Sequence, residues 1–417
     1  MRDTLLTLLS CPFCGTKLSL VDGPATVRAG AEIEAGVLGC DCCAFPIVAG
    51  IPVLIADDVT RDAMHALEAG RSRDALFALL GLEGKRAGRF ESQLAGGANT
   101  SYQKALALLS PDAEGAYFLY RFSDPTFLAA EALVRAVGQH RSATRGPRLD
   151  LCGGSGHLTR ALARLTPPDA TTSPTVVADL YFWKLWLATR FTAPDCAAVC
   201  CDANVPLPFR PDLFSLVVLA DAFPYIWHKR LCADDMIRVT AAEGIILMPH
   251  LHSAHGDNVS AGDTLPPAAY RALFAPHQPR LFSDRALFDL LLDERAIDLS
   301  LDRSPDALGK EATFTLVASR RADLFRRYDL PDAVDVGGKL IVNPLYKVER
   351  RNGRSVLTLA FPTPEYEAEF VACRRYLPDT VTVDADLTGP IETTLPPGRR
   401  EALRRQHVLI DAPPQYY

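Results

Sequence analysis

The sequence has no apolar run long enough to span a bilayer, so we expect neither a transmembrane helix nor a membrane partner. Its first residues form a short apolar patch without a small-residue cleavage site, which indicates mature sequence rather than a signal peptide. The sequence also lacks an excess of basic charge. It has 44 lysines and arginines and 50 acidic residues, so its net charge is −6. That balance argues against a broad surface for nucleic acid, although it leaves a local basic patch open.

The 417 residues are enough for two or three domains, and 48% hydrophobic with 23% charged residues is ordinary for a globular protein. Eleven cysteines are unevenly placed, with five in the first 43 residues and six after residue 150. The later ones are expected to be small buried hydrophobic residues. Without a secretory signal we expect a cytoplasmic, reducing setting, where clustered cysteines indicate a metal site rather than disulfides.

Two Cys-x-x-Cys pairs, Cys11 with Cys14 and Cys40 with Cys43, are 26 residues apart (40 − 14). Four thiolates in two such pairs form a tetrahedral zinc site, and the metal can hold together a module too small for its own core. We therefore predict one Zn²⁺ on these four residues. A pair of redox dithiols and a decayed knuckle are the alternatives. Cys42 adds an ambiguity, since it could replace Cys40 or Cys43 or stay free.

The segment after the second pair reads Phe-Pro-Ile and then Gly-Ile-Pro, at residues 45–52. Together with the cysteine pairs, it resembles the small zinc-ribbon family that serves as activator subunit of tRNA, ribosomal-RNA and release-factor methyltransferases. In that family a Tyr-Pro-Ile segment follows the last cysteine, and here Phe45 takes the place of the tyrosine. The resemblance covers residues 1–57 and implies a built-in partner that packs on a catalytic domain.

A glycine-rich turn at residues 152–156 follows a strand-like stretch at 148–151 that carries an acid, Asp150, and it precedes a helical pattern. Strand, tight loop and helix in this order open a nucleotide-binding βαβ unit. Glycines let the backbone approach a ligand closely, and the helix N-terminus offers free N–H groups. A tight turn without any ligand is the alternative. A second strand ends at Asp179, 23 residues past Gly156 (179 − 156), which fits a carboxylate that binds ribose hydroxyls.

More pieces of one pattern follow this unit. An Asp-Ala…Leu-Pro-Phe segment occupies residues 202–209, a buried strand ending in an acid occupies 214–222, and an apolar strand occupies 244–249. The series, over residues 145–255, resembles the class I S-adenosylmethionine (SAM)-dependent methyltransferases. Phosphate-binding dinucleotide domains do not carry the Asp-Ala…Leu-Pro-Phe piece.

The resemblance implies a Rossmann-like α/β fold that binds SAM at the carboxyl ends of its strands. It assigns Asp179 to the ribose and Asp202 to the adenine amine. The sequence departs from the family where Cys152, Ser215 and Glu243 replace a glycine, an aspartate and a glycine. The cofactor-binding residues that the resemblance implies are Asp150, Cys152, Gly153, Gly154, Gly156, Asp179, Leu180, Asp202 and Ala203.

Residues 58–140 have a helical pattern, interrupted at 83–100 by glycines and charges that indicate a loop. An aromatic-rich stretch at 117–127 surrounds Arg121. In class I methyltransferases the helices before the glycine loop often close over the cofactor, which makes Arg121 and Tyr120 candidates for binding it. Arg121 would then pair with the methionine carboxylate as a bidentate donor. Alternatively, the aromatic residues form a core and Arg121 is a structural cation.

Candidate catalytic residues follow the fourth and fifth strands, where substrate and methyl group meet in this family. Asp221 and Tyr225 come after the fourth strand, and His250 and His252 come after the fifth. One of these histidines could orient or deprotonate the acceptor, because imidazole titrates near neutral pH. A structural polar cluster is a second interpretation. A metal site is a third, but Asp257 is the one acid close by in sequence and no thiol is near.

The patterns predict four segments along the chain. A zinc ribbon at 1–57 precedes a helical linker or lid at 58–140, and a methyltransferase domain at 141–320 precedes a small α+β appendage at 321–417. The final strand of the methyltransferase domain, at 312–319, is expected to be antiparallel as in the family. The appendage would cover the catalytic domain or build a homodimer contact, and the sequence does not decide between the two.

Together these features predict a SAM-dependent methyltransferase with its own Zn²⁺ module. The acidic balance favours a small-molecule acceptor, with specialised metabolism as its setting, over nucleic acid. The activator-like module favours the alternative of a tRNA, rRNA or protein acceptor. A protein of another class also fits, namely a non-catalytic scaffold that keeps SAM and docks a partner through the ribbon.

Overall fold

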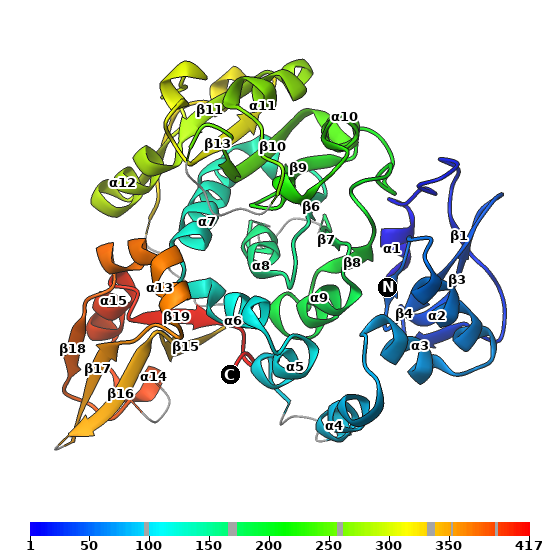
Figure 1. The fold of residues 1–417 in the computed structure, drawn as a ribbon, viewed down its shortest axis with the longest axis horizontal. Coiled ribbons are helices and arrows are strands. Elements are labelled where there is room, and N and C mark those ends of the chain that lie inside the picture. Colours follow the sequence, from blue (N-terminus) through cyan, green and yellow to red (C-terminus); the bar gives the residue numbers. More distant parts are fainter. Residues whose placement is uncertain (96–99, 166–172, 257–261, 332–337, 352, 388–390) are drawn as a thin grey trace. The chain divides into compact units, whose positions relative to one another are not determined.

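The computed structural model describes residues 1–95, 100–165, 173–256, 262–331, 338–351, 353–387 and 391–417. These residues belong to two compact units (Figure 1). The first unit contains Met1–Ala95 and Ala129–Leu330, and the second contains Gly96–Leu128 and Pro331–Tyr417. The segment predicted as one helical lid, 58–140, is therefore divided between the two units. Within the described ranges, no helix has the length and apolar character needed to cross a membrane.

A seven-stranded sheet is the centre of the first unit, in the order β11-β13-β10-β9-β6-β7-β8 (Figure 1). Its strands are β6 Arg148–Leu151, β7 Thr175–Asp179, β8 Ala197–Cys200, β9 Phe214–Val218, β10 Thr240–His252, β11 Pro279–Ser283 and β13 Thr313–Ala318. In this order, β10, β9, β6, β7 and β8 pair with one another in parallel. The strand β13 pairs antiparallel with both β10 and β11. This is the class I methyltransferase fold that the sequence predicts, with the antiparallel final strand as expected.

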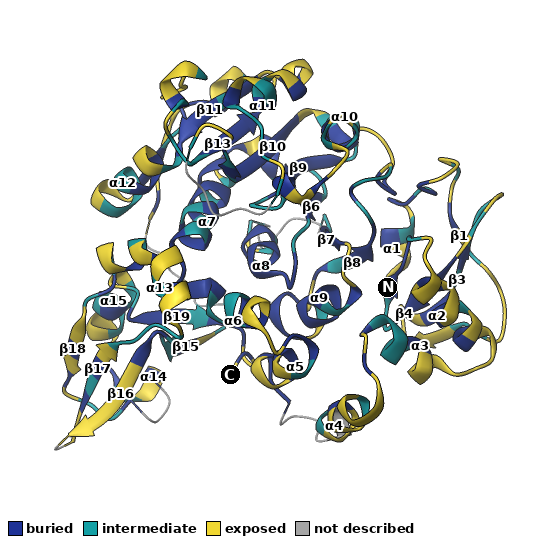
Figure 2. Cartoon of the chain, in the orientation of Figure 1, coloured by how far each residue is buried: buried dark blue, intermediate teal, exposed yellow. Residues whose placement is uncertain are grey.

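Helices alternate with the strands because the chain switches repeatedly from continuous apolar runs to amphipathic patterns. Every residue of β6, β7 and β9 is buried, as parallel strands covered on both faces require (Figure 2). The helices of this part are α7 Pro125–Gly138, α8 His157–Ala163, α9 Phe182–Leu187, α10 Lys229–Val239, α11 Pro267–Leu273 and α12 Asp284–Glu294. A short antiparallel pair, β12 Ala296–Asp298 with β14 Arg327–Asp329, also belongs to the first unit.

The N-terminal module of the first unit is a small antiparallel sheet with one helical turn. Its elements are α1 Asp3–Leu6, β1 Ser19–Leu20, β2 Val27–Ala29, β3 Glu32–Gly39, β4 Ala44–Val48 and β5 Ile51–Pro52. Val53 forms a parallel bridge to Cys200 at the end of β8, so the module continues the edge of the central sheet. Leu9 forms an antiparallel bridge to Phe209 of the Leu-Pro-Phe segment. The module therefore packs on the α/β domain through backbone pairing at two places.

Three helices follow the module, namely α2 Asp58–Glu68, α3 Ser72–Leu79 and α4 Gly84–Ala95. The loop predicted at 83–100 is wrong over α4. Phe90 of α4 is buried, and its ring lies 5.2 Å from that of Trp186 and 6.2 Å from that of Phe77. One buried aromatic side chain thus anchors a helix whose glycines and charges favour a loop locally.

The second unit combines small sheets and short helices around its own apolar core. Its strands are β15 Lys339–Val342, β16 Tyr346–Arg351, β17 Arg354–Leu359, β18 Thr380–Val383 and β19 Leu409–Ala412, paired antiparallel as β15-β19 and β16-β17-β18. Its helices are α5 Tyr102–Leu109, α6 Ala113–Tyr120, α13 Pro364–Glu369, α14 Ile391–Thr394 and α15 Pro397–Arg405. The appendage is α+β as predicted, and α5 and α6 belong to the same unit because Tyr117 and Tyr120 pack against its core.

His277 gives the first unit a pH-dependent contribution to stability. Its side chain is 1% exposed, and Nε2 lies 3.0 Å from the carbonyl oxygen of Gly244. Burial lowers the pKa of His277, and Nδ1 has no hydrogen-bond partner among the described residues. Because the folded pKa is below the unfolded one, near 6.5, stability from this group is present above that pH and lost as the pH falls.

We therefore expect unfolding free energy to fall on acidification from pH 7 to 5, and less so in His277→Gln. One group contributes at most about 1.4 kcal/mol per pH unit to this slope. Urea titrations at each pH measure it, and the exposed His65 supplies the control His65→Gln. Equal slopes for wild type and His277→Gln would contradict the assignment.

Candidate functional site

The glycine loop after β6 has a backbone that side chains would obstruct. A Cβ on Gly153 would lie 2.7 Å from the Cγ of Asp150 and 2.8 Å from Val177, and Gly156 has a φ of +82°. Cys152 adopts the left-handed region as well, with a φ of 58°. Burial raises the pKa of the Cys152 thiol well above its usual value, so this departure from the family introduces a neutral side chain.

Two carboxylates, Asp150 and Asp179, connect the elements around this loop. Asp150 is 1% exposed and accepts a hydrogen bond of 2.6 Å from the hydroxyl of Thr159 on α8. Asp179, at the end of β7, accepts from the backbone N–H of Gly154 at 2.9 Å and from that of Tyr181 at 2.9 Å. The loop and the acid predicted to bind ribose therefore lie together at the carboxyl edge of the sheet.

The end of β8 joins the same edge. The N–H of Cys201 donates to the carbonyl oxygen of Asp179 at 3.0 Å, and Asp202 follows directly. Asp202 accepts from the backbone and side-chain nitrogens of Asn204 at 2.8 and 2.9 Å, and Asn204 accepts in turn from the N–H of Trp227 at 2.7 Å. Asn204, which the sequence analysis missed, connects the predicted adenine side to the loop after β9. Its position two residues after an acid is typical of an Asx turn.

The donor set fits SAM. Buried Ala203 and exposed Leu180 lie next to Asp202 and Asp179, so apolar surface adjoins the carboxylates. Closely approachable backbone at Gly153 and Gly154 and a carboxylate at the end of β7 suit a ligand with a diol and a polar chain.

Arg121 and Tyr120 belong to the second unit and have partners there. The guanidinium of Arg121 lies 2.9 Å from a carboxylate oxygen of buried Asp124 and 4.9 Å from the ring centroid of Tyr117. The ring of Tyr120 lies 5.6 Å from that of Tyr366. These contacts fit the structural interpretation of Arg121, and its contact with the cofactor stays a prediction.

Asp221, His250 and His252 converge where β9 and β10 end, and one ligand atom of each lies within 4.8 Å of the others. His252 Nε2 is 2.9 Å from a carboxylate oxygen of Asp221. The rings of His250 and His252 are 5.1 Å apart. Tyr225 is in the short helix Phe223–Tyr225 after β9 and is 57% exposed. The structure thus brings together three of the four predicted catalytic side chains.

A fourth polar residue of this cluster escaped the sequence analysis. Asp284, at the start of α12, has one carboxylate oxygen 3.2 Å from Nδ1 of His250. Its other oxygen accepts a hydrogen bond of 2.6 Å from the hydroxyl of Thr315 on β13. The Ser-Asp pair before an apolar pattern indicates only a helix N-terminus, so its position beside His250 could not be read from sequence.

The N-terminal cysteines form a compact cluster. The sulfur atoms of Cys11, Cys14, Cys40 and Cys42 all lie within 4.8 Å of one another. Cys40 Sγ is 3.7 Å from Cys14 Sγ and 3.7 Å from Cys42 Sγ. Cys43, the predicted fourth ligand, is outside this group, and its backbone N–H donates to Cys40 Sγ instead. The sulfur of Cys43 nevertheless lies 3.3 Å from that of Cys42, at the border of the cluster.

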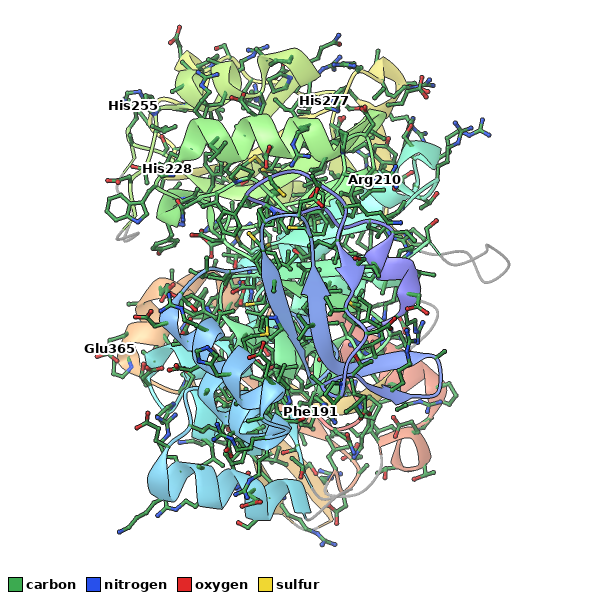
Figure 3. The ribbon with its side chains drawn as sticks, turned by 90° about the vertical axis from the view of Figure 1, so that its right-hand side faces the viewer. Phe191, Arg210, His228, His255, His277 and Glu365 are labelled. Atoms are coloured by element: carbon green, nitrogen blue, oxygen red, sulfur yellow. The ribbon has the colours of Figure 1, made fainter. Side chains whose placement is uncertain are left out.

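A cleft of about 840 Å³ lies between the N-terminal module and the Leu-Pro-Phe segment. Phe13, Lys17 and Arg210 are among its lining residues. The guanidinium of Arg210, which is labelled in Figure 3, donates to the carbonyl oxygen of Thr7 at 3.2 Å. None of the predicted cofactor-binding residues lines it. The cleft is therefore a feature of the interface between module and domain, distinct from the glycine loop.

Comparison with known proteins concerns the fold alone. No family model matches the sequence, and no curated protein matches it. Solved structures that match include a chain from the complex of the Haloferax volcanii Trm112 methyltransferase activator with a methyltransferase (16% identity, 45% of this chain and 88% of that chain, TM-score 0.32). A SAM-dependent methyltransferase from Thermotoga maritima matches at 9% identity over 53% of this chain and 100% of that chain, with a TM-score of 0.34. One from Aquifex aeolicus matches at 10% identity over 49% and 97%, with a TM-score of 0.33.

Proposed function

We propose that this protein is a SAM-dependent methyltransferase. The observation that carries the proposal is the glycine loop after β6, tied through Gly154 to Asp179 on the sheet edge that also holds Asp221 and His252. SAM, when bound, supplies an electrophilic methyl group. Asp179 accepts the ribose hydroxyls, and Asp202 accepts from the adenine amine.

The other cofactor contacts belong to this proposal as predictions. Gly153, Gly154 and Gly156 bring backbone close to the ligand, and Asp150 joins β6 to α8 through its hydrogen bond with Thr159. Arg121 and Tyr120 contribute to the methionine end only if their present partners are exchanged. Both side chains would have to leave these partners before they could bind SAM.

Asp221, His250 and His252 contact the methyl acceptor, and Tyr225 forms part of its wall. Their position at the carboxyl ends of β9 and β10 supports this role, because ligands of open α/β sheets bind beyond these ends. Close packing of the acceptor against the methyl group and the exclusion of water accelerate the methyl transfer.

The N-terminal module is a zinc ribbon that acts as a built-in activator subunit. Four sulfur atoms 2.3 Å from a tetrahedral Zn²⁺ lie about 3.8 Å apart, and the distances from Cys40 to Cys14 and Cys42 are 3.7 Å. Cys11, Cys14, Cys40 and Cys42 are therefore the proposed ligands. Backbone pairing of Leu9 with Phe209 supports a role in holding the Asp-Ala…Leu-Pro-Phe loop.

The acceptor is a small molecule, and the setting is the cytoplasm. The net charge of −6 supports a small acceptor over RNA. Because the ribbon already pairs with its own catalytic domain, an additional protein partner is not needed to occupy that edge. An RNA or protein acceptor and a non-catalytic scaffold are the competing functions.

Labelled SAM distinguishes these functions. After incubation with cell extract, we expect label to move to the small-molecule fraction in the presence of the protein and not with Asp179→Ala. Label in the RNA or protein fraction would show that the acceptor is RNA or protein and not a small molecule. Bound SAM with no label in any fraction would refute the enzyme and favour the scaffold.

A further inference from the structure

The cluster of Asp221, His250 and His252 has the donors of a metal site. The sequence offers the two histidines only Asp257 as a nearby acid, and that residue lies outside the described ranges. Tertiary structure supplies Asp221 instead, from the end of the neighbouring strand. Two imidazoles and one carboxylate form a ligand set for Zn²⁺ and for Fe²⁺, Co²⁺ or Mn²⁺, and they leave coordination positions open.

A second layer orients one of the histidines. The carboxylate of Asp284 engages His250 Nδ1 at 3.2 Å, and Thr315 fixes that carboxylate at 2.6 Å. A histidine whose Nδ1–H is held by a carboxylate offers the lone pair of Nε2 to a metal. Histidine ligands of metal ions usually have such a carboxylate partner, whereas a polar cluster exposed to water does not need one.

The backbone holds the cluster at an unusual place. Asp221 and His250 both adopt left-handed conformations, with φ of 62° and 58°. His250 lies in a bulge of β10, where the pairing with β13 shifts between Met248 and Leu251. Bulges next to functional sites redirect side chains, and left-handed non-glycine residues persist only where their surroundings hold them.

The pairing of His252 with Asp221 argues against a simple base. If Nε2–H donates to Asp221, the basic atom is Nδ1, and this atom is buried with no hydrogen-bond partner among the described residues. A buried Nδ1 is out of reach of an acceptor. By contrast, nitrogen and oxygen ligands about 2.1 Å from one ion lie roughly 3.0–3.4 Å apart, close to the 2.9 Å between His252 Nε2 and Asp221.

We propose that Asp221, His250 and His252 bind one divalent transition-metal ion, which binds and activates a hydroxyl group of the acceptor. The step rests on the proposed methyltransferase function. The metal lowers the pKa of the bound hydroxyl, and its proton leaves to solvent. The oxygen forms a bond to the methyl carbon while the bond from that carbon to sulfur breaks. The electron pair stays on sulfur, which gives the O-methylated product and S-adenosylhomocysteine.

Titration of the metal-stripped full chain with Co²⁺ alone tests the site without any turnover. We expect two equivalents, one with the thiolate-to-cobalt charge-transfer absorption of the cysteine cluster and one with only weak visible bands. Asp221→Asn and His252→Gln should lose the second equivalent and keep the first, and retention of the first reports a folded chain. Asp284→Asn, which leaves all three ligands, should weaken the second equivalent by about 10–100-fold.

His255→Ala is the matched control, because His255 is exposed and outside the cluster (Figure 3). It should bind both equivalents as wild type does. A single equivalent in wild type, or two in both Asp221→Asn and His252→Gln, would overturn the metal site. Methyl transfer with one equivalent bound would refute the metal and leave the methyltransferase standing. Two bound equivalents of Co²⁺ without any methyl transfer would support the metal site and refute the methyltransferase.

Discussion

Replacing Cys14 or Cys40 by serine should remove one zinc per chain and lower the melting temperature by roughly 10 °C or more. The effect is large because the ribbon shares one apolar core with the α/β domain, including Leu9, Phe45 and Phe209. Loss of the metal therefore exposes surface well beyond the ribbon itself. Elemental analysis of protein purified in metal-free buffer and calorimetry measure the two quantities, and a chelator should lower the melting temperature of the wild type in the same way.

Cys42 and Cys43 provide the matched pair for this experiment. Cys42→Ser should lose zinc, because its sulfur is in the cluster, and Cys43→Ser should keep it. The reverse result would restore the ligand set that spacing predicts. A wild-type chain that is folded and free of metal in both measurements would refute the zinc site altogether.

Asp179→Ala should weaken SAM binding by about 2–4 kcal/mol, a loss of roughly 30- to 900-fold in affinity. Two charge-assisted hydrogen bonds to the ribose would be lost. The same substitution also releases the N–H of Gly154, so the glycine loop loses its attachment to β7. Titration calorimetry with SAM measures the change.

Two further variants separate these causes. Asp179→Asn keeps one oxygen acceptor for Gly154 and should lose affinity mainly through the ribose. Asp195→Asn, at an exposed acid of the same domain, should bind SAM like the wild type. Unchanged affinity in Asp179→Ala would count against the placement of the cofactor on this edge.

The strands and the glycine loop were readable from sequence for a local reason. Residues 148–151, 175–179 and 214–218 are buried along their whole length, so they are rich in leucine, valine, alanine and phenylalanine. The loop needs glycine at position 153 because a Cβ there would meet Asp150 only three residues away. Short-range constraints of this kind leave a mark in the sequence.

Long-range contacts left no such mark. The helix α4 depends on Phe90 reaching Trp186, almost a hundred residues further on, so its glycines and charges misled the prediction. Likewise α5 and α6 pack with the C-terminal part of the chain, and the pattern of 58–140 alone does not reveal that division.

The sequence by itself determined the alternation of strands and helices, the two cysteine pairs and the glycine loop, because each rests on periodicity or on short-range spacing, whereas the class I fold and the zinc ribbon followed from the resemblances. Tertiary structure alone decided that Cys42 joins Cys11, Cys14 and Cys40 in one cluster, since the sequence leaves either of two adjacent cysteines as the fourth ligand. It also decided the partners of the histidines. His252 meets Asp221 across 31 positions, and His250 meets Asp284 across 34. The first pair exists because the neighbouring strands β9 and β10 end side by side, and the second because α12 begins after β11, which is separated from β10 by β13.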